Sequence, residues 1–452
     1  PTVGGGSKTF IPAGGANLPP AWARSVGSAS ITVAIIDTGV VGSHRDLNGR
    51  LLPGYDFISS SALTSLGVPV NFVANDGDGR DADASDPGDW VTDAEEAQYP
   101  NACGNSASGS SWHGTHMAGI VAAQWGNDVE AATNTIRAGT RTAGIGPALR
   151  ILPVRALGKC GGTSSDVIDA VRWAAGLSVP GVPANANPAR VINLSLGGQG
   201  GSCDPAVNPD SPYATAVNEV LARGSVVVAA AGNDGALGVL QPANCPGVIA
   251  VTAHVINGDS ADYANVGPEV AISAPGGGDP TLLQTTPALL NTDNAYVIWS
   301  TGLFGATTPT STVSSTDTRS GDALLGLTGT SPATPHVAAA VALMLSANPA
   351  LAPQNVRGFL TASARPHPAG GYCLSQQGLN QCGAGLLDVG AALTLVQPNL
   401  PPVPPAPPPL PPEPVPPPPP SGGGGGGSLP LWPVLLMFSL ALAREVRRRG
   451  SR

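Results

Sequence analysis

Three short segments that lie far apart in the sequence carry an acid, a base and a nucleophile. They are V-A-I-I-D-T-G around Asp37, H-G-T-H-M-A-G around His113 and G-T-S-P-A-T-P-H around Ser331. A serine hydroxyl is a weak nucleophile at neutral pH, and it becomes reactive when an imidazole takes its proton and a carboxylate orients that imidazole. These residue types therefore indicate nucleophilic catalysis by Ser331, with His113 as the base and Asp37 as its support.

The residues around these three positions predict where each lies in a fold. Residues 30–36 form a nearly continuous apolar run rich in β-branched residues, which is typical of a parallel strand buried on both faces. Asp37 would follow at the carboxyl end of that strand, where open α/β sheets place their sites. An apolar stretch typical of a buried helix follows both His113 and Ser331, and a helix amino terminus suits a developing oxyanion. Pro335 is expected in the first turn of the second helix, where a missing N–H is tolerated.

Strand and helix patterns alternate along residues 1–397, which predicts one α/β domain with a doubly wound, mostly parallel sheet and helices on both faces. Strands are predicted over 150–156, 191–198, 225–231 and 248–253, and a helix over 164–176. A further helix is well delimited, with Ser211 as its cap, Pro212 at its first position and Gly224 as its stop.

With the three segments in the chain order Asp, His, Ser, the sequence resembles the subtilisin-like serine peptidases, or subtilases. The resemblance implies an endopeptidase that cleaves polypeptides through an acyl-enzyme. It also implies that Asn233, in a Gly-rich turn after the strand at 225–231, donates its side-chain amide to the oxyanion. The implied substrate-binding residues are Ser195, Leu196 and Gly197, which would pair with the extended peptide, and Ala230, Ala231 and Gly232, which would line the primary pocket.

Other interpretations of these segments stay open. Each segment alone is compatible with an ordinary strand-end turn or helix cap, and only the complete set favours an enzyme. His116 follows His113 by three positions, but no Glu separates them as in a zinc-peptidase helix, so we interpret His116, and also His336, as packed structural histidines. A catalytically silent, surface-tethered binding protein on the same fold and an esterase of non-peptide substrates are the rival functions.

Composition excludes one class of partner and fits a secreted enzyme. The formal net charge is −9 and only 11% of residues are charged, which argues against the basic surface that nucleic-acid binding needs. The chain begins with Pro1 and shows no signal-peptide pattern, so by resemblance we expect Pro1 to lie near a mature start. We expect a monomer that acts on polypeptide substrates.

The six cysteines predict disulfide bonds. No C-x-x-C pair and no Cys/His cluster with zinc spacing occurs, so disulfides in an oxidising compartment are favoured over free thiols in a cytosolic protein. Six cysteines allow 15 pairings. We expect the sequential one: Cys103 with Cys160, Cys203 with Cys245, and Cys373 with Cys382.

Residues 75–89, N-D-G-D-G-R-D-A-D-A-S-D-P-G-D, crowd carboxylates together among glycines. Their mutual repulsion favours a bound cation, and calcium accepts six to eight oxygen ligands in flexible geometry. The resemblance strengthens this prediction, because several subtilases bind calcium in this region; the alternative is a solvated acidic loop. The candidate ligands are Asp76, Asp78, Asp81 and Asp83, with Asp46 in H-R-D-L as the match to a family calcium ligand.

The composition changes abruptly near Pro398. Residues 398–420 predict a disordered, semi-rigid Pro-rich linker. Residues 421–452 contain a run of six glycines at 422–427, an apolar stretch at 429–443 and an arginine-rich end. A helix over that stretch is too short for a hydrocarbon core of about 30 Å. This region resembles the carboxy-terminal sorting signals of Gram-negative bacteria. That resemblance implies an extracellular or cell-surface protein, transient membrane contact and cleavage by a rhomboid-type protease, the alternative being a short transmembrane anchor.

Overall fold

The computed structural model describes residues 13–59, 67–103, 108–125, 142–279, 296–309, 321–375 and 380–397, with the backbone of 129–130, 135–136, 312–314 and 317–320. The chain divides into two units, Pro1–Pro404 and Pro405–Arg452, and every described residue belongs to the first. The predicted Pro-rich linker, glycine run and apolar tail segment lie outside the described residues. Within the described part of the chain, no helix is both long and apolar enough to cross a bilayer.

The described residues form a seven-stranded sheet with the spatial order β2-β5-β1-β6-β7-β8-β9, and each neighbouring pair runs parallel. The fold class predicted from the sequence is therefore confirmed. The strands are β1 (Thr32–Asp37), β2 (Tyr55–Asp56), β5 (Arg150–Arg155), β6 (Val191–Leu194), β7 (Val226–Ala230), β8 (Ile249–His254) and β9 (Val270–Pro275).

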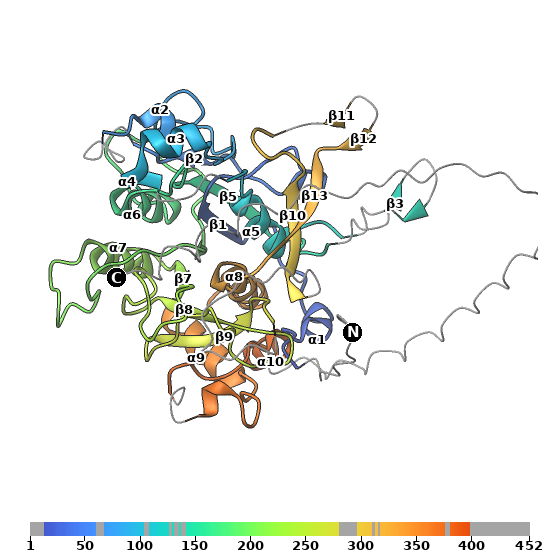
Figure 1. The fold of residues 1–452 in the computed structure, drawn as a ribbon. Coiled ribbons are helices and arrows are strands. Elements are labelled where there is room, and N and C mark those ends of the chain that lie inside the picture. Colours follow the sequence, from blue (N-terminus) through green and yellow to red (C-terminus); the bar gives the residue numbers. More distant parts are fainter. Residues whose placement is uncertain are drawn as a thin grey trace, which may run out of the picture. The chain divides into compact units, whose positions relative to one another are not determined.

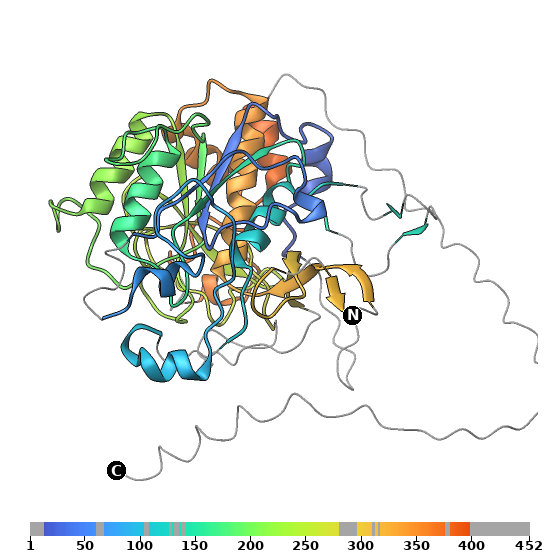
Figure 2. The same ribbon diagram turned by 90° about the horizontal axis from the view of Figure 1, so that it is seen from above.

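Helices cover both faces of this sheet because its central strands are apolar on both sides. Strand β1 is fully buried, and its alternate side chains enter two cores. Val33 and Ile35 belong to the core on the side of α5 and α8, whereas Ala34 and Ile36 belong to the core on the side of α6 and α7. Figure 2 shows the green helices α6 and α7 on one side of the sheet and the orange helix α8 on the other. These helices are α5 (His113–Ala122), α6 (Ser164–Ala174), α7 (Pro212–Ala222) and α8 (Thr330–Ala347).

Smaller elements surround this three-layer centre (Figure 1). Strands β10 (Ile298–Leu303) and β13 (Asp322–Leu327) form an antiparallel pair that contacts α5. The other short strands are β3 (Val129–Glu130), β4 (Thr135–Ile136), β11 (Thr312–Ser314) and β12 (Asp317–Ser320). The remaining helices are α1 (Leu18–Trp22), η1 (Arg45–Leu47), α2 (Val70–Ala74), α3 (Asp93–Gln98), α4 (Pro100–Cys103), α9 (Pro353–Ser363), η4 (Tyr372–Leu374) and α10 (Val389–Val396).

Local signals explain where helix α7 begins and ends. The hydroxyl of Ser211 accepts a hydrogen bond from the backbone N–H of Ala214, and Pro212 occupies the first helical position, where no N–H is needed. Gly224 follows the helix with a φ of 90°, which a residue without a Cβ adopts at little cost. The expected cap, first residue and stop therefore correspond to the observed helix.

Three disulfide bonds hold the outer segments, and they join the cysteines in the sequential order that we expected. Cys103–Cys160 connects α4 to the segment after β5, and Cys203–Cys245 connects the segments after β6 and β7. Cys373–Cys382 closes a short loop near the end of the described chain. All six cysteines are disulfide-bonded, and no free cysteine occurs among the described residues.

We predict that the disulfides differ in their contribution to stability according to the length of chain that each closes. Cys203 and Cys245 are 42 residues apart, whereas Cys373 and Cys382 are 9 apart. Loop-closure entropy gives roughly 4 kcal/mol for the first and roughly 3 kcal/mol for the second. Replacing each pair by Ala and comparing the free energies of unfolding in urea should show the larger loss for Cys203–Cys245; equal losses, or a reversed order, would contradict this account.

Candidate active site

Asp37 and His113 meet in the structure through a hydrogen bond. Asp37 is the last residue of β1 and is 0% exposed, and His113 is the first residue of α5. Nδ1 of His113 lies 2.7 Å from Oδ1 of Asp37, which also accepts the backbone N–H of Thr38 at 2.8 Å. An ionised carboxylate only accepts hydrogen bonds, so Nδ1 of His113 carries the proton of this hydrogen bond. In the neutral imidazole, Nε2 is then left as an acceptor.

The environment of His113 favours its charged form. Burial acts to lower the pKa of His113, but the charge of Asp37 and its hydrogen bond, together with the charges of Asp89 and Asp86, outweigh burial and raise the pKa above the ordinary value. The His113 side chain still keeps 23% of its surface exposed, toward a cleft. A raised pKa means that the protonated imidazole is favoured, which suits a side chain that accepts a proton and later returns it.

Ser331 lies at the start of α8, on the same cleft as His113. Its hydroxyl donates to the carbonyl of Ser195 at 3.0 Å, and the hydroxyl of Ser195 donates in return to the carbonyl of Ser331 at 2.8 Å. Pro335 explains why that carbonyl is available. It is the sixth residue of α8 rather than part of the first turn, as we had expected, and its missing N–H leaves the carbonyl four residues earlier, that of Ser331, without a helical donor.

The amide of Asn233 has a defined orientation beside Ser331. Its Oδ1 accepts from the backbone N–H of Thr330 at 2.8 Å and from the Thr330 hydroxyl at 2.9 Å. Because both partners are donors there, Oδ1 must face Thr330, and the Nδ2 amide group is left to donate elsewhere. Asn233 is exposed and lines the cleft together with Ser331 and His113, so its free N–H groups can serve a ligand there.

Two polar residues that the sequence analysis missed hold the turns that carry these groups. The hydroxyl of Tyr263 accepts the backbone N–H of Gly329, directly before α8, at 3.0 Å. Oδ1 of Asn265 accepts the backbone N–H groups of Asp234 and Ala236 in the turn after Asn233. Neither residue carries a local motif, because each acts on a segment far away in the chain.

A cleft of about 670 Å³ runs past these residues. Ser195, Leu196 and Gly197, the predicted substrate-pairing segment, line it. The other predicted substrate residues, Ala230, Ala231 and Gly232, are buried at the end of β7 and do not line this cleft, because β7 is a central strand covered by helices on both faces. The Cys103–Cys160 disulfide also lies on the cleft wall.

The two histidines interpreted as structural are indeed engaged with backbone. Nε2 of His116 is 3.0 Å from the carbonyls of Ile298 and Leu325, so it ties α5 to the β10–β13 pair. Burial lowers the pKa of His116 to about 3 and that of His336 to about 4, and Nδ1 of His336 donates to the Pro332 carbonyl at 2.7 Å. Both side chains are therefore neutral near pH 7.

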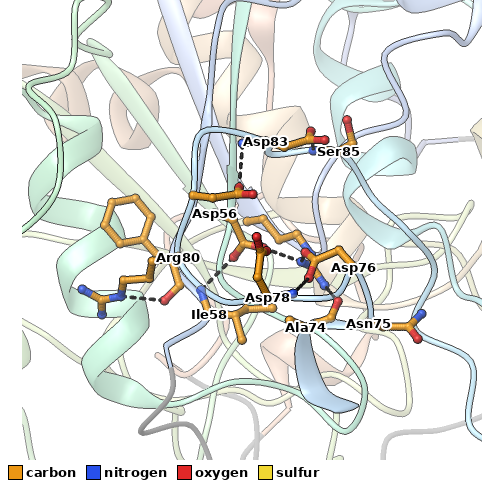
Figure 3. A network of polar contacts seen from close by, with 12 residues as sticks. Asp56, Ile58, Ala74, Asn75, Asp76, Asp78, Arg80, Asp83 and Ser85 are labelled. Atoms are coloured by element: carbon orange, nitrogen blue, oxygen red, sulfur yellow. Dashed lines mark hydrogen bonds and ion pairs between the residues drawn. The ribbon is translucent and has the colours of Figure 1, made fainter. Parts of the chain in front are cut away.

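The structure does not gather the four predicted calcium ligands into a site. Figure 3 shows Asp83 apart from Asp76 and Asp78. Asp76, Asp81 and Asp83 each turn a carboxylate oxygen toward the backbone N–H two residues further on, at 2.7–3.3 Å. Asp78 is exposed. Within the described part of the chain, no group of three or more His, Cys, Asp or Glu side chains is arranged to hold a metal ion.

A buried guanidinium takes the place of the expected cation. Arg155, the last residue of β5, is 0% exposed and donates to the carboxylates of Asp56 and Asp76 and to the carbonyl of Ala74. Of the four candidate ligands, only Asp76 is paired with this guanidinium, and the four carboxylates as arranged here do not form a calcium site. Asp46 lies elsewhere, buried in η1, with the Arg45 guanidinium 3.6 Å away.

A parallel α/β sheet covered by helices, with His, Ser and Asn side chains on one cleft and a buried Asp hydrogen-bonded to that His, is the arrangement of a serine hydrolase. Comparison with known families makes this specific, because the subtilase family model matches residues 28–385. The chain therefore belongs to the subtilase family, as the sequence motifs indicated.

Individual relatives agree with this assignment. An extracellular protease of Xanthomonas campestris pv. campestris is 41% identical over 384 residues, which are 84% of this chain and 54% of the relative. An extracellular basic protease of Dichelobacter nodosus is 37% identical over 256 residues, 56% of this chain and 38% of the relative. A solved protease structure from Pseudoalteromonas arctica has a TM-score of 0.67 and 39% identity, covering 85% of this chain and 95% of that one. The chain thus spans about half or less of the length of these two curated relatives.

We predict that Asp37 controls the titration of His113. Replacing Asp37 by Asn removes the charge that opposes burial, so the pKa of His113 should fall below its wild-type value. NMR titration of the imidazole resonances measures this directly, and His336, which lies outside the Asp37 hydrogen bond, is the internal control. An unchanged His113 titration would mean that the carboxylate does not set its proton affinity.

We predict that Arg155 is a major contributor to stability. Arg155→Met leaves two carboxylates without their cation, and breaking a buried ion pair in this way costs about 3–5 kcal/mol of unfolding free energy. The matched control is Arg80→Met, whose guanidinium is 23% exposed and pairs with Asp166 and Asp169, so its loss should be smaller. Urea unfolding with and without EGTA measures both. A large EGTA effect on the wild-type protein, with little effect of Arg155→Met, would favour the calcium prediction instead.

Proposed function

We propose that this chain is a secreted serine endopeptidase that hydrolyses peptide bonds in polypeptides through an acyl-enzyme. The observation that carries the proposal is the 2.7 Å hydrogen bond between His113 and Asp37 on a cleft that Ser331 and Asn233 also line. Membership of the subtilase family and the similarity to extracellular proteases support it.

In the first step, the hydroxyl of Ser331 attacks the substrate carbonyl carbon and passes its proton to Nε2 of His113. Asp37 holds His113 in the tautomer that accepts at Nε2, and its negative charge stabilises the imidazolium that forms. The Ser331 hydroxyl donates to the Ser195 carbonyl in the free protein, so it must turn from Ser195 to His113 when substrate binds. Such rearrangement on substrate binding is common, because hydrogen bonds of free active sites often tighten only in the complex.

The tetrahedral intermediate then places a negative charge on the former carbonyl oxygen. The amide of Asn233 donates to this oxygen, since its Oδ1 is already held by Thr330 and its N–H groups are available. The backbone N–H of Ser331, at the start of α8, is the second donor. His113 next returns the proton to the leaving amine, and water hydrolyses the acyl-enzyme by the same proton transfers in reverse.

The substrate backbone binds in extended form along Ser195, Leu196 and Gly197. These residues follow β6 and line the cleft, so they provide an edge that pairs with a peptide through backbone hydrogen bonds. Ala230, Ala231 and Gly232 lie at and directly after the end of β7, the strand that pairs with β6, so they lie beside this edge and are buried.

Export to the extracellular space fits the three disulfide bonds, because such bonds persist in oxidising compartments. We propose that residues 421–452 are a sorting segment that a rhomboid-type protease removes. Intact mass measurement of the secreted protein tests this, since recovery of Arg452 on it would exclude removal.

The decisive experiment combines covalent labelling with proteolysis. A fluorophosphonate probe should label Ser331, and the purified protein should digest casein; Ser331→Ala should lose both activities while its thermal melting midpoint stays close to that of the wild type. Labelling without casein digestion would favour an esterase, and absence of labelling would favour a silent binding protein.

We predict a specific partial defect for the oxyanion donor. Asn233→Ala should lower kcat about 10²–10³-fold, the loss measured when a subtilisin loses such a donor, with a much smaller effect on KM. Steady-state kinetics on a soluble peptide substrate separates the two constants. A defect confined to KM would assign Asn233 to substrate binding instead.

A further inference from the structure

The D-P-G-D turn, Asp86–Asp89, contacts the segments of both members of the catalytic pair. Asp86 is 1% exposed; its Oδ2 accepts the hydroxyl proton of Thr38 at 2.7 Å and its Oδ1 accepts the backbone N–H of Gly88 at 2.9 Å. It forms no ion pair with a basic side chain in the described part of the chain. Burying a carboxyl without a contacting cation costs folding free energy unless hydrogen bonds compensate it. This cost points to a specific role for the two acceptor oxygens of Asp86.

Thr38 connects Asp86 to the catalytic pair. Its hydroxyl proton points to Asp86, so its oxygen is free to accept the backbone N–H of Gly114, the residue after His113, at 3.1 Å. Its own backbone N–H donates to Oδ1 of Asp37 at 2.8 Å. One residue therefore joins the end of β1 to the first turn of α5, and Asp86 sets the direction of its hydroxyl.

Asp89 acts on the other side of His113 through Ser111. Its Oδ1 accepts the Ser111 backbone N–H at 2.6 Å and its Oδ2 accepts the Ser111 hydroxyl proton at 2.7 Å. The Ser111 oxygen is thereby left to accept the backbone N–H of His113 at 3.3 Å. Helix α5 has no side-chain cap at Trp112, its N-cap residue, so two hydroxyls held by two carboxylates satisfy its first free N–H groups.

The D-P-G-D turn is fixed by the backbone conformation and the hydrogen bond of Gly88. Gly88 has a φ of +99°, and a Cβ at this position would collide with the carbonyl of Thr307 and with Ser110, so glycine is required there. Its carbonyl accepts the Asn75 side-chain amide at 2.8 Å, which joins the turn to the start of the acidic loop. The next residue, Asp76, is held by the buried guanidinium of Arg155.

We propose that Asp86 and Asp89 are positioning residues that hold Asp37 and His113 at hydrogen-bond distance, acting through the hydroxyls of Thr38 and Ser111. This inference rests on the proposed function, because it assigns the two carboxylates a role in the same reaction. The D-P-G-D turn thus ties β1 and α5 together from one short segment.

The same carboxylates act on His113 through their charge. The groups that face His113 are Asp37 from β1, Asp86 and Asp89 from the turn, and His116 from α5, which is neutral near pH 7. Both turn carboxylates raise the pKa of His113. Burial raises the pKa of Asp86 itself to about 7, so this carboxyl is partly protonated near neutral pH and contributes less charge there. Removing the charge of Asp89 should lower the pKa of His113, so the neutral, base-competent imidazole persists to lower pH and the acid limb of kcat/KM moves downward. Asp86→Asn should move the acid limb in the same direction but by less.

The test compares Asp86→Asn and Asp89→Asn with Asp78→Asn. The control makes the same chemical change in the same acidic loop, but its side chain is exposed. Each Asn keeps one acceptor and loses the other, so we expect kcat on a soluble peptide to fall roughly tenfold to a hundredfold, as for a small misplacement of catalytic groups, with KM within about twofold. Asp78→Asn should match the wild type in both constants and in the acid limb.

A second pair of variants separates positioning from general destabilisation. Thr38→Val removes the hydroxyl that Asp86 holds and should reproduce the kcat loss, whereas Thr38→Ser keeps a hydroxyl and should recover most of it. Combining Thr38→Val with Asp86→Asn should add little to either single loss, because both break one chain of hydrogen bonds.

Two outcomes would overturn the proposal. One is kcat and an acid limb in Asp86→Asn and Asp89→Asn that equal those of Asp78→Asn; the other is a Thr38→Ser variant as impaired as Thr38→Val. Failure of the proposed function appears separately, as a wild-type protein that neither reacts with a fluorophosphonate nor cleaves peptides. In that case NMR titration of His113 in the same variants still tests whether Asp86 and Asp89 act on His113. An unchanged His113 pKa in both variants would exclude such an action.

Discussion

The hydrogen bond between Asp37 and His113 depends on one distance, that between the end of β1 and the start of α5. The two residues are separated by 76 positions in the chain, and neither strand nor helix propensity sets where they meet. Parallel pairing fixes β1 between β5 and β6, and packing of α5 on β1 and on α8 fixes the helix axis. Directed hydrogen bonds at the amino terminus of α5 add to this packing, because hydrogen bonds weaken steeply away from their preferred angles and so define the position of the first turn.

The segment between the two residues supplies those directed bonds. It leaves β1, forms the acidic loop and returns to α5, and on the way it places carboxylates against Thr38 and Ser111. Each carboxylate oxygen only accepts, so each bound hydroxyl must direct its proton to the carboxylate and its lone pairs toward α5. A chain of fixed donor directions is stiffer than a set of apolar contacts, which explains how an acidic insertion can serve as a structural part of the site.

Sequence patterns predicted the features that depend on neighbouring residues. The apolar runs predicted the central strands, and Ser211 and Pro212 predicted the start of α7. The three motifs predicted the family and an Asp–His pair that the structure brings together. Arg155 was beyond this kind of reasoning, because R-I-L-P-V-R-A reads as a buried strand and the carboxylates that it meets lie elsewhere in the chain. A local crowd of acidic residues indicates the need for a positive charge but not its source, and Arg155 supplies part of that charge from a strand far away in the chain.

Pro335 shows the same limit on a smaller scale. The sequence predicted only that the missing N–H of Pro335 would be tolerated in the first turn of the helix. In the structure Pro335 lies further inside α8, and its missing N–H affects the carbonyl four residues earlier. The carbonyl of Ser331 loses its helical partner and accepts the Ser195 hydroxyl, while the Ser331 hydroxyl donates back to the Ser195 carbonyl. These two reciprocal bonds couple the nucleophile to the segment along which the substrate is proposed to lie. A peptide that pairs with this segment therefore meets a serine whose position relative to the segment is already fixed by these two bonds.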